Sequence, residues 1–162
     1  MPAKKTAKPP KRSAGILVYR TTEKTLQFLL VHPGGPFWRN KDAGAWSIPK
    51  GEYLEGEDPL AAAIRELGEE TGFALPPGEF IALGELRQPS GKRITGWARE
   101  ADLPADEAKS NLFSLEWPPR SGRMQAFPEV DKAAWFDAET ARAKLIAGQR
   151  EVLDRLLRKL DL

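Results

Sequence analysis

Three glutamates occupy five neighbouring positions in the segment RELGEETG, residues 65–72. Glu66 and Glu70 are four residues apart and Glu66 and Glu69 are three apart, so on a helix all three carboxylates converge on one side. Like charges at these spacings destabilise a helix, and anions in its last turns oppose the helix dipole. A bound cation would offset both costs. A solvated acidic face is the alternative reading of the same pattern.

The residue types restrict which cation this would be. Carboxylate oxygens without histidine or cysteine suit Mg²⁺, or Mn²⁺ in its place, and not zinc. Magnesium usually shares its coordination with the phosphates of a substrate. In the preceding segment, residues 46–58, Gly51 lets the backbone bend closely around a ligand, and Lys50 places an ammonium group beside the carboxylates. The pattern therefore predicts a substrate that contains phosphate.

A helix over residues 59–71 must position these glutamates. Asp58 is a suitable N-cap, Pro59 suits the first helical position, and Gly72 suits the left-handed position after the helix. The apolar residues recur at helical spacing and are expected to face the core. These residues are Leu60, Ala63, Ile64 and Leu67.

The rest of the chain reads as strands followed by helices. Apolar or β-branched runs predict strands at 13–20, 26–32, 47–49, 79–88, 92–100, 112–117 and 133–136. Asp137 is expected to cap a helix that ends near Leu145, and an amphipathic helix is expected at 150–160. Segments 33–46 and 118–131 are expected to be loops, because they are rich in Pro, Gly and polar residues. This order predicts an α/β or α+β fold with a mixed sheet.

Composition places the chain among soluble globular proteins. Its 162 residues suffice for one domain, expected at 13–162, and no cysteine is present for a disulfide or a thiolate metal site. The sequence contains no run of eighteen apolar residues that could span a membrane. It also lacks the apolar stretch after Met1 that a secretory signal would have, so a cytoplasmic location is expected. No feature specifies an oligomeric state.

The positive charge is concentrated at the N-terminus. Residues 1–12 carry five basic residues and no acid, which leaves −3 on the other 150 residues from a total of +2. Such a segment is expected to be a disordered tail that solvates the protein. If the protein contacts nucleic acid, this tail is where the contact is expected.

Residues 51–73 resemble the signature of the Nudix hydrolases, G-x5-E-x7-R-E-U-x-E-E-x-G-U, where U is a bulky apolar residue. The positions that match are Gly51, Glu57, Arg65, Glu66, Leu67, Glu69, Glu70 and Gly72, with Phe73 in the last apolar position. The resemblance implies an α/β/α sandwich in which a loop–helix–loop forms the catalytic site. It also implies an enzyme in which water attacks phosphorus in a nucleoside diphosphate linked to another group, X.

The resemblance also assigns roles to individual residues. Glu66, Glu69 and Glu70 would hold Mg²⁺ with a backbone carbonyl at Lys50 or Gly51. Arg65 would pair with a glutamate of the motif. Glu129, in the segment FPEVD at 127–131, would add an acidic ligand from a distant loop. The general base is expected to be Glu66, with Glu129 as the second choice.

Other residues are candidates to bind the substrate. Phe37 and Trp38, in the loop before the motif, are expected to stack on a nucleobase, with packing as the alternative. Lys50 is expected to contact a phosphate. Arg123 is a further candidate for a phosphate contact, with a solvated loop arginine as the alternative. His32 is the only histidine, and it is expected to end a strand without a catalytic role.

The sequence PKG at 49–51 and the segment 127–131 resemble enzymes that act on dinucleoside polyphosphates and RNA pyrophosphohydrolases. The favoured substrate is therefore a dinucleoside polyphosphate or a nucleoside triphosphate. Pro89 lies near a position typical of ADP-ribose hydrolases, so ADP-ribose, a nucleotide sugar or an RNA 5′ end is the alternative. A non-catalytic domain that senses nucleotides or binds RNA is the alternative of another class, although such domains usually lose glutamates that this chain keeps.

Overall fold

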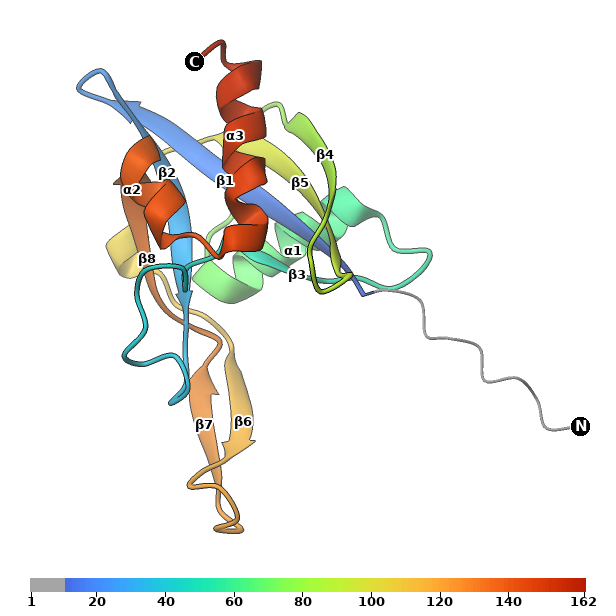
Figure 1. Ribbon diagram of the computed structural model, residues 1–162, viewed down its shortest axis with the longest axis vertical. Coiled ribbons are helices and arrows are strands. Elements are labelled where there is room, and N and C mark those ends of the chain that lie inside the picture. The colour runs from blue at the N-terminus through green and yellow to red at the C-terminus, as the bar shows by residue number, and fades with distance from the viewer. Residues whose placement is uncertain (1–10) are drawn as a thin grey trace, which may run out of the picture.

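A mixed β-sheet forms the centre of the protein, which a computed structural model describes over residues 11–162 (Figure 1). Its order is β4-β5-β1-β2-β8, and β3 pairs with the first residues of β1. β1 and β5 are parallel, whereas the other neighbours are antiparallel. The strands are β1 (Arg12–Thr22), β2 (Thr25–Pro33), β3 (Lys50–Glu52), β4 (Ile81–Arg87), β5 (Arg93–Glu100) and β8 (Val130–Asp137).

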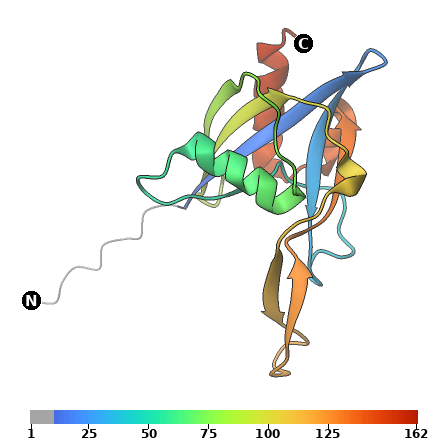
Figure 2. The same cartoon turned by 180° about the vertical axis from the view of Figure 1, so that it is seen from behind.

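Helices cover both faces of this sheet. α1 (Pro59–Thr71) lies on one face, and α2 (Ala138–Lys144) and α3 (Arg150–Lys159) lie on the other (Figures 1 and 2). Strand β1 is buried on both sides, since Ile16 packs in the cluster with α1 and Leu17 packs in the cluster with α3. The expected α/β/α sandwich with a mixed sheet is therefore confirmed.

The signals at the ends of helix α1 act as predicted. The Ala61 backbone N–H donates to the Asp58 carboxylate over 3.0 Å, and Pro59 is the first helical residue. Gly72 ends the helix in the left-handed conformation, with φ of 78°. The predicted span 59–71 is confirmed at both ends.

The buried face of α1 differs from the prediction at Leu60 and Ile64. Leu60 is only partly buried and lies outside both core clusters. Ile64 was expected in the core, but its side chain is 40% exposed, and Ala62 is buried instead. The helix thus turns the row of Ala62, Glu66 and Glu70, which are four residues apart, toward the sheet. This rotation carries two of the three clustered glutamates to the covered side of the helix.

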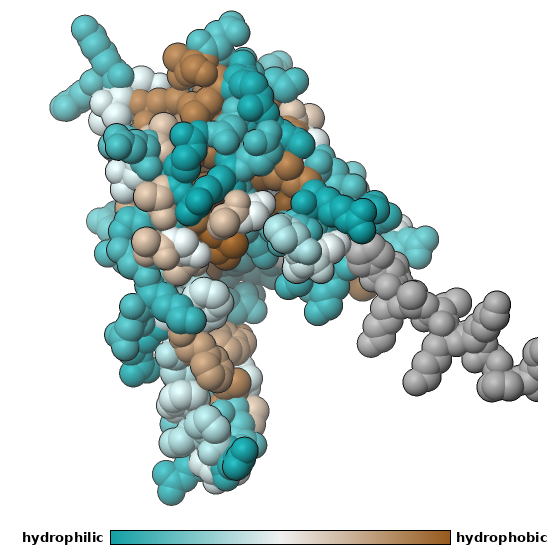
Figure 3. All heavy atoms as spheres, in the orientation of Figure 1, coloured by the Kyte–Doolittle hydropathy of each residue, from teal (hydrophilic) through white to brown (hydrophobic). Residues whose placement is uncertain are grey.

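The segment 118–131 was wrongly predicted to be a loop throughout. Within it, β7 (Met124–Pro128) pairs antiparallel with β6 (Leu112–Glu116), and the two strands project from the body as an arm, residues 112–128 (Figure 1). Figure 3 shows hydrophobic side chains on the upper part of the arm and hydrophilic ones over its tip. Met124 and Leu112 are both 65% exposed. With neither face of β7 buried in the core, its sequence lacks the apolar alternation that identifies a strand.

Two further boundaries differ from the expectations. The strand expected at 47–49 is displaced to β3, and Ser47 only forms an isolated bridge to Val31. Residues 1–10 of the expected tail 1–12 lie outside the described part of the chain, and Arg12 is the first residue of β1. Among residues 11–162, no helix combines the length and hydrophobicity needed to cross a bilayer.

Candidate active site

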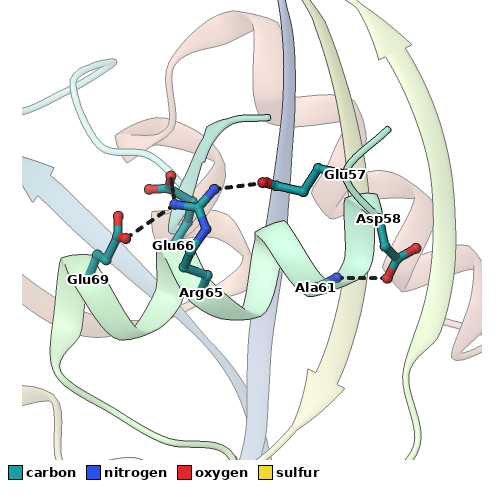
Figure 4. A network of polar contacts seen from close by, with 6 residues as sticks. All are labelled: Glu57, Asp58, Ala61, Arg65, Glu66 and Glu69. Carbon is teal, nitrogen blue, oxygen red and sulfur yellow. Dashed lines mark hydrogen bonds and ion pairs between the residues drawn. The ribbon is translucent and has the colours of Figure 1, made fainter. Parts of the chain in front are cut away.

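Arg65 connects the loop before α1 to two of the clustered glutamates (Figure 4). Its Nη2 lies 3.0 Å from Glu57 Oε1, and its Nη1 lies 3.0 Å from Glu66 Oε1 and 3.2 Å from Glu69 Oε1. Hydrogen bonds to Glu57 and Glu69 raise the pKa of Arg65 further above its ordinary value. The guanidinium group therefore aligns three carboxylates that would otherwise repel one another.

Glu66 lies directly over the backbone of β3. A Cβ atom added to Gly51 would be 2.0 Å from Glu66 Cδ, so only glycine leaves space for the carboxyl group. Burial raises the pKa of Glu66, and the negative charge of Glu69 raises it further, while Arg65 opposes both effects. The carboxyl group of Glu66 and the backbone of Gly51 thus form one oxygen-rich surface.

Glu70 is held beside Lys50, one turn of the helix after Glu66. Burial raises the pKa of Glu70 to about 8, and the neighbouring Glu66 adds to this shift. The ammonium group and backbone amide of Lys50 act in the opposite direction but do not cancel it. The ionised form of Glu70 is therefore short of compensating positive charge.

Glu129 reaches the same place from 59 positions along the chain. It lines a cavity of about 180 Å³ together with Glu70, Lys50 and Trp38. Burial, followed by the charge of Glu69, raises the pKa of Glu129. The structure thus brings together the four glutamates, Lys50 and Trp38 that the sequence singled out.

Two predicted substrate-binding residues lie elsewhere. Phe37 is 59% exposed and packs edge-on against Trp117, with ring centroids 5.4 Å apart. Arg123 lies on the arm, just before β7, and does not line the cavity with Trp38. Phe37 therefore contacts the arm and does not line the cavity of Trp38.

The cavity also has walls that the sequence did not indicate. Ser47 and Ile146 line it, from the loop before β3 and from the segment after α2. Gln149 orders the loop, because its side-chain Oε1 accepts from the Ile48 backbone N–H over 2.9 Å. No motif marks these residues, and only their distant pairing across the fold makes them neighbours.

The donor chemistry of this cluster suits a hard divalent cation. All four acidic groups offer carboxylate oxygens, and three of them have raised pKa values because they are buried near like charges. Over residues 11–162, however, no three acidic, histidine or cysteine side chains converge closely enough to enclose a metal ion. Glu66 and Glu69 are instead held in ion pairs with Arg65. The carboxylate groups are therefore suitable ligands for the ion, but their side chains would have to rotate to enclose it.

Comparison with known proteins gives the family. The model of the NUDIX domain matches residues 9–156, which is most of the chain. The chain therefore belongs to the NUDIX family, as the motif at 51–73 predicted.

Relatives of this chain are named for more than one activity. An RNA pyrophosphohydrolase from Photobacterium profundum is 30% identical over 131 residues, covering 78% of this chain and 75% of the relative. A Myxococcus xanthus protein named octanoyltransferase is 30% identical over 155 residues, 92% of this chain, but the chain spans only 37% of that relative's length.

Solved structures agree on the fold. A Caenorhabditis elegans Ap4A hydrolase has a TM-score of 0.63 at 23% identity, with 92% of this chain and 98% of the other covered. The NUDIX domain of Shewanella oneidensis NrtR, complexed with ADP ribose, has a TM-score of 0.66 at 15% identity, covering 95% of this chain and 90% of that one. At these identities the likeness establishes the fold alone.

Proposed function

We propose that this protein is a Mg²⁺-dependent pyrophosphohydrolase that cleaves a nucleoside diphosphate linked to another group. The favoured substrate is a dinucleoside polyphosphate or a nucleoside triphosphate. One observation carries the proposal: Glu70 and Glu129 line a cavity with Lys50, and Glu66 and Glu69 lie close enough to raise the pKa values of these two carboxyl groups, so negative charge exceeds positive charge there. Such a site favours a divalent cation and, behind it, phosphate oxygens.

The acidic residues divide into metal ligands and a base in this proposal. Glu66, Glu69, Glu70 and Glu129 hold Mg²⁺, for which Mn²⁺ can substitute, together with the backbone carbonyl of Gly51. A bound ion supplies neutralisation of phosphate charge and a lower pKa for the attacking water. Glu66 accepts the proton of that water, with Glu129 as the second choice. Its raised pKa brings Glu66 closer to the value that suits a base near neutral pH.

The other cavity residues bind the substrate. The Lys50 ammonium group faces the same cavity as Glu70 and Glu129, where it can pair with a phosphate oxygen. Trp38 offers an aromatic surface for a nucleobase, and the Lys41 Nζ lies 4.9 Å from its ring centroid, near enough to contact an adjacent phosphate. Arg123, on the arm, would reach only a substrate that extends beyond the cavity.

A panel of substrates tests this function. It should include diadenosine polyphosphates, nucleoside triphosphates, ADP-ribose, nucleotide sugars and 5′-triphosphorylated RNA, each with and without Mg²⁺. We expect turnover that requires the metal and is greatest on a dinucleoside polyphosphate or a triphosphate. Binding without turnover of any member would instead support a nucleotide-sensing domain.

Magnesium is expected to raise the melting temperature Tm, and more strongly at alkaline pH. The carboxyl group of Glu70 has a pKa of about 8 when folded and about 4.5 when unfolded. Between these values the folded state keeps a proton that the unfolded state has lost, so the metal-free protein loses stability as pH rises toward about 8. The metal binds the ionised form, so protons compete with it at lower pH.

Differential scanning fluorimetry measures this effect. At roughly a hundred times its dissociation constant, Mg²⁺ should add about 3 kcal/mol, or about 5–10 °C in Tm, near pH 8.5, and distinctly less near pH 6. KCl at equal ionic strength is the control for screening. Equal melting temperatures with and without saturating Mg²⁺ would contradict the metal site.

A further inference from the structure

His32 lies where two walls of the candidate active site meet. It is 7% exposed near the end of β2, and its ring packs edge-on against Trp46, with centroids 5.2 Å apart. One wall is the loop 34–45, which carries Trp38, and the other is the segment 128–131, which carries Glu129. Neither wall belongs to α1, so the helix alone cannot position them.

Each ring nitrogen of His32 binds one of these walls. Nε2 lies 2.6 Å from the carbonyl oxygen of Lys41, and Nδ1 lies 2.8 Å from Oδ1 of Asp131. The carbonyl and the carboxylate thus lie within hydrogen-bond distance of opposite sides of one imidazole ring. The ring then acts as a two-sided cross-link between the walls.

Both ends of this cross-link continue to the residues of the cavity. The Lys41 backbone N–H donates to the Trp38 carbonyl over 3.0 Å. Asp131 is two residues after Glu129, whose own carbonyl accepts from the Gly34 N–H over 3.0 Å. Gly34 approaches so closely that an added Cβ would lie 2.0 Å from the Pro128 carbonyl oxygen. The two walls are therefore joined twice, once directly at Gly34 and once through the ring of His32, on the side of Lys41 and Asp131.

We propose that His32 is a positioning residue, which with Asp131 sets Glu129 and the loop of Trp38 at their working separation. This role rests on the proposed function, because it concerns the binding of phosphate and nucleobase in the same cavity. His32 does not touch the substrate in this scheme. Misplacing a ligand or binding group by about 1 Å can cost on the order of a hundredfold in rate, so losing this cross-link is expected to lower the rate of turnover.

Asp131→Ala is the main test, because its side chain is 37% exposed and its loss leaves the core intact. His32→Gln is the second variant, which can bind one wall but not both. We expect kcat/KM to fall by about 10–100-fold in each, the range that groups behind metal ligands typically contribute. Asp102→Ala is the matched control, since it removes a carboxylate from the exposed ion pair with Arg20, outside the cavity of Glu129.

A double-mutant cycle separates positioning from a general structural role. If Asp131 acts by placing Glu129, the variant Asp131→Ala/Glu129→Gln should be scarcely slower than Glu129→Gln alone. Effects that multiply, or wild-type kcat/KM in Asp131→Ala, would overturn the positioning role while wild-type turnover upholds the proposed function. A wild-type protein without any Mg²⁺-dependent turnover would overturn the proposed function, and this inference with it.

Discussion

Replacing Glu70 by glutamine is expected to remove most Mg²⁺-dependent turnover while stabilising the metal-free protein at alkaline pH. Glutamine has the same shape but no charge, so it forfeits a carboxylate ligand without leaving a cavity. We expect kcat/KM to fall by more than about 100-fold, because residues that only support metal ligands already contribute about 10–100-fold. Steady-state kinetics over a range of Mg²⁺ concentrations measures the loss.

The gain in stability follows from the pKa of the replaced group. Burial raises the pKa of Glu70 to about 8, so above this pH the wild type keeps an unfavourable buried charge. Glutamine cannot ionise, so the variant escapes the loss of stability that the wild type suffers between about pH 4.5 and 8. Without metal, its Tm should exceed that of the wild type near pH 8.5 and approach it near pH 5.

Glu55→Gln is the control for this experiment, because Glu55 is an exposed glutamate in the loop just before α1. It should change neither the rate nor the pH dependence of Tm. If Glu70→Gln kept wild-type turnover, the assignment of Glu70 as a metal ligand would be wrong. The variant could instead lose turnover while its Tm still falls with rising pH as in the wild type. The loss of stability at alkaline pH would then arise from ionisation of Glu66 and Glu129, whose pKa values are also raised.

Local chemistry made helix α1 and its glutamates predictable. Asp58, Pro59 and Gly72 each determine a backbone conformation through their own side chains or lack of one, so neighbours in sequence suffice to place both helix ends. The spacing of Glu66 and Glu70 then puts them on one side whatever the rest of the fold does. Glu129 was found only through a resemblance, because nothing local connects it with α1.

The missed features depend on contacts between distant segments. Strand β7 is held by pairing with β6 in the arm, so its own residues need not alternate. The exposure of Ile64 follows from how α1 is turned on the sheet, which periodicity determines only to within about one residue. His32 reads as an ordinary strand residue until Asp131 is found 99 positions away, bonded to its ring.

Replacing Gly51 by alanine is expected to disable the site with little harm to the fold. The added methyl group would lie 2.0 Å from Cδ of Glu66 and 2.3 Å or less from both its carboxylate oxygens. Those atoms are the end of a flexible side chain, so Glu66 can swing away while β3 keeps its pairing with Ala14 of β1. Turnover should fall by at least about 100-fold, as for the loss of a residue that holds a metal ligand in place.

Gly68→Ala is the matched control, because it adds the same methyl group to the same motif. There the nearest atom is the Phe73 carbonyl oxygen at 3.8 Å, an ordinary contact. Alanine inside a helix is favoured over glycine by about 1 kcal/mol, so this variant should stay active and melt slightly higher. The displacement also predicts that Gly51→Ala adds little to the loss in Glu66→Gln, because both remove the same carboxylate from the same position. Independent, multiplying effects would show that Gly51 acts through something other than the placement of Glu66.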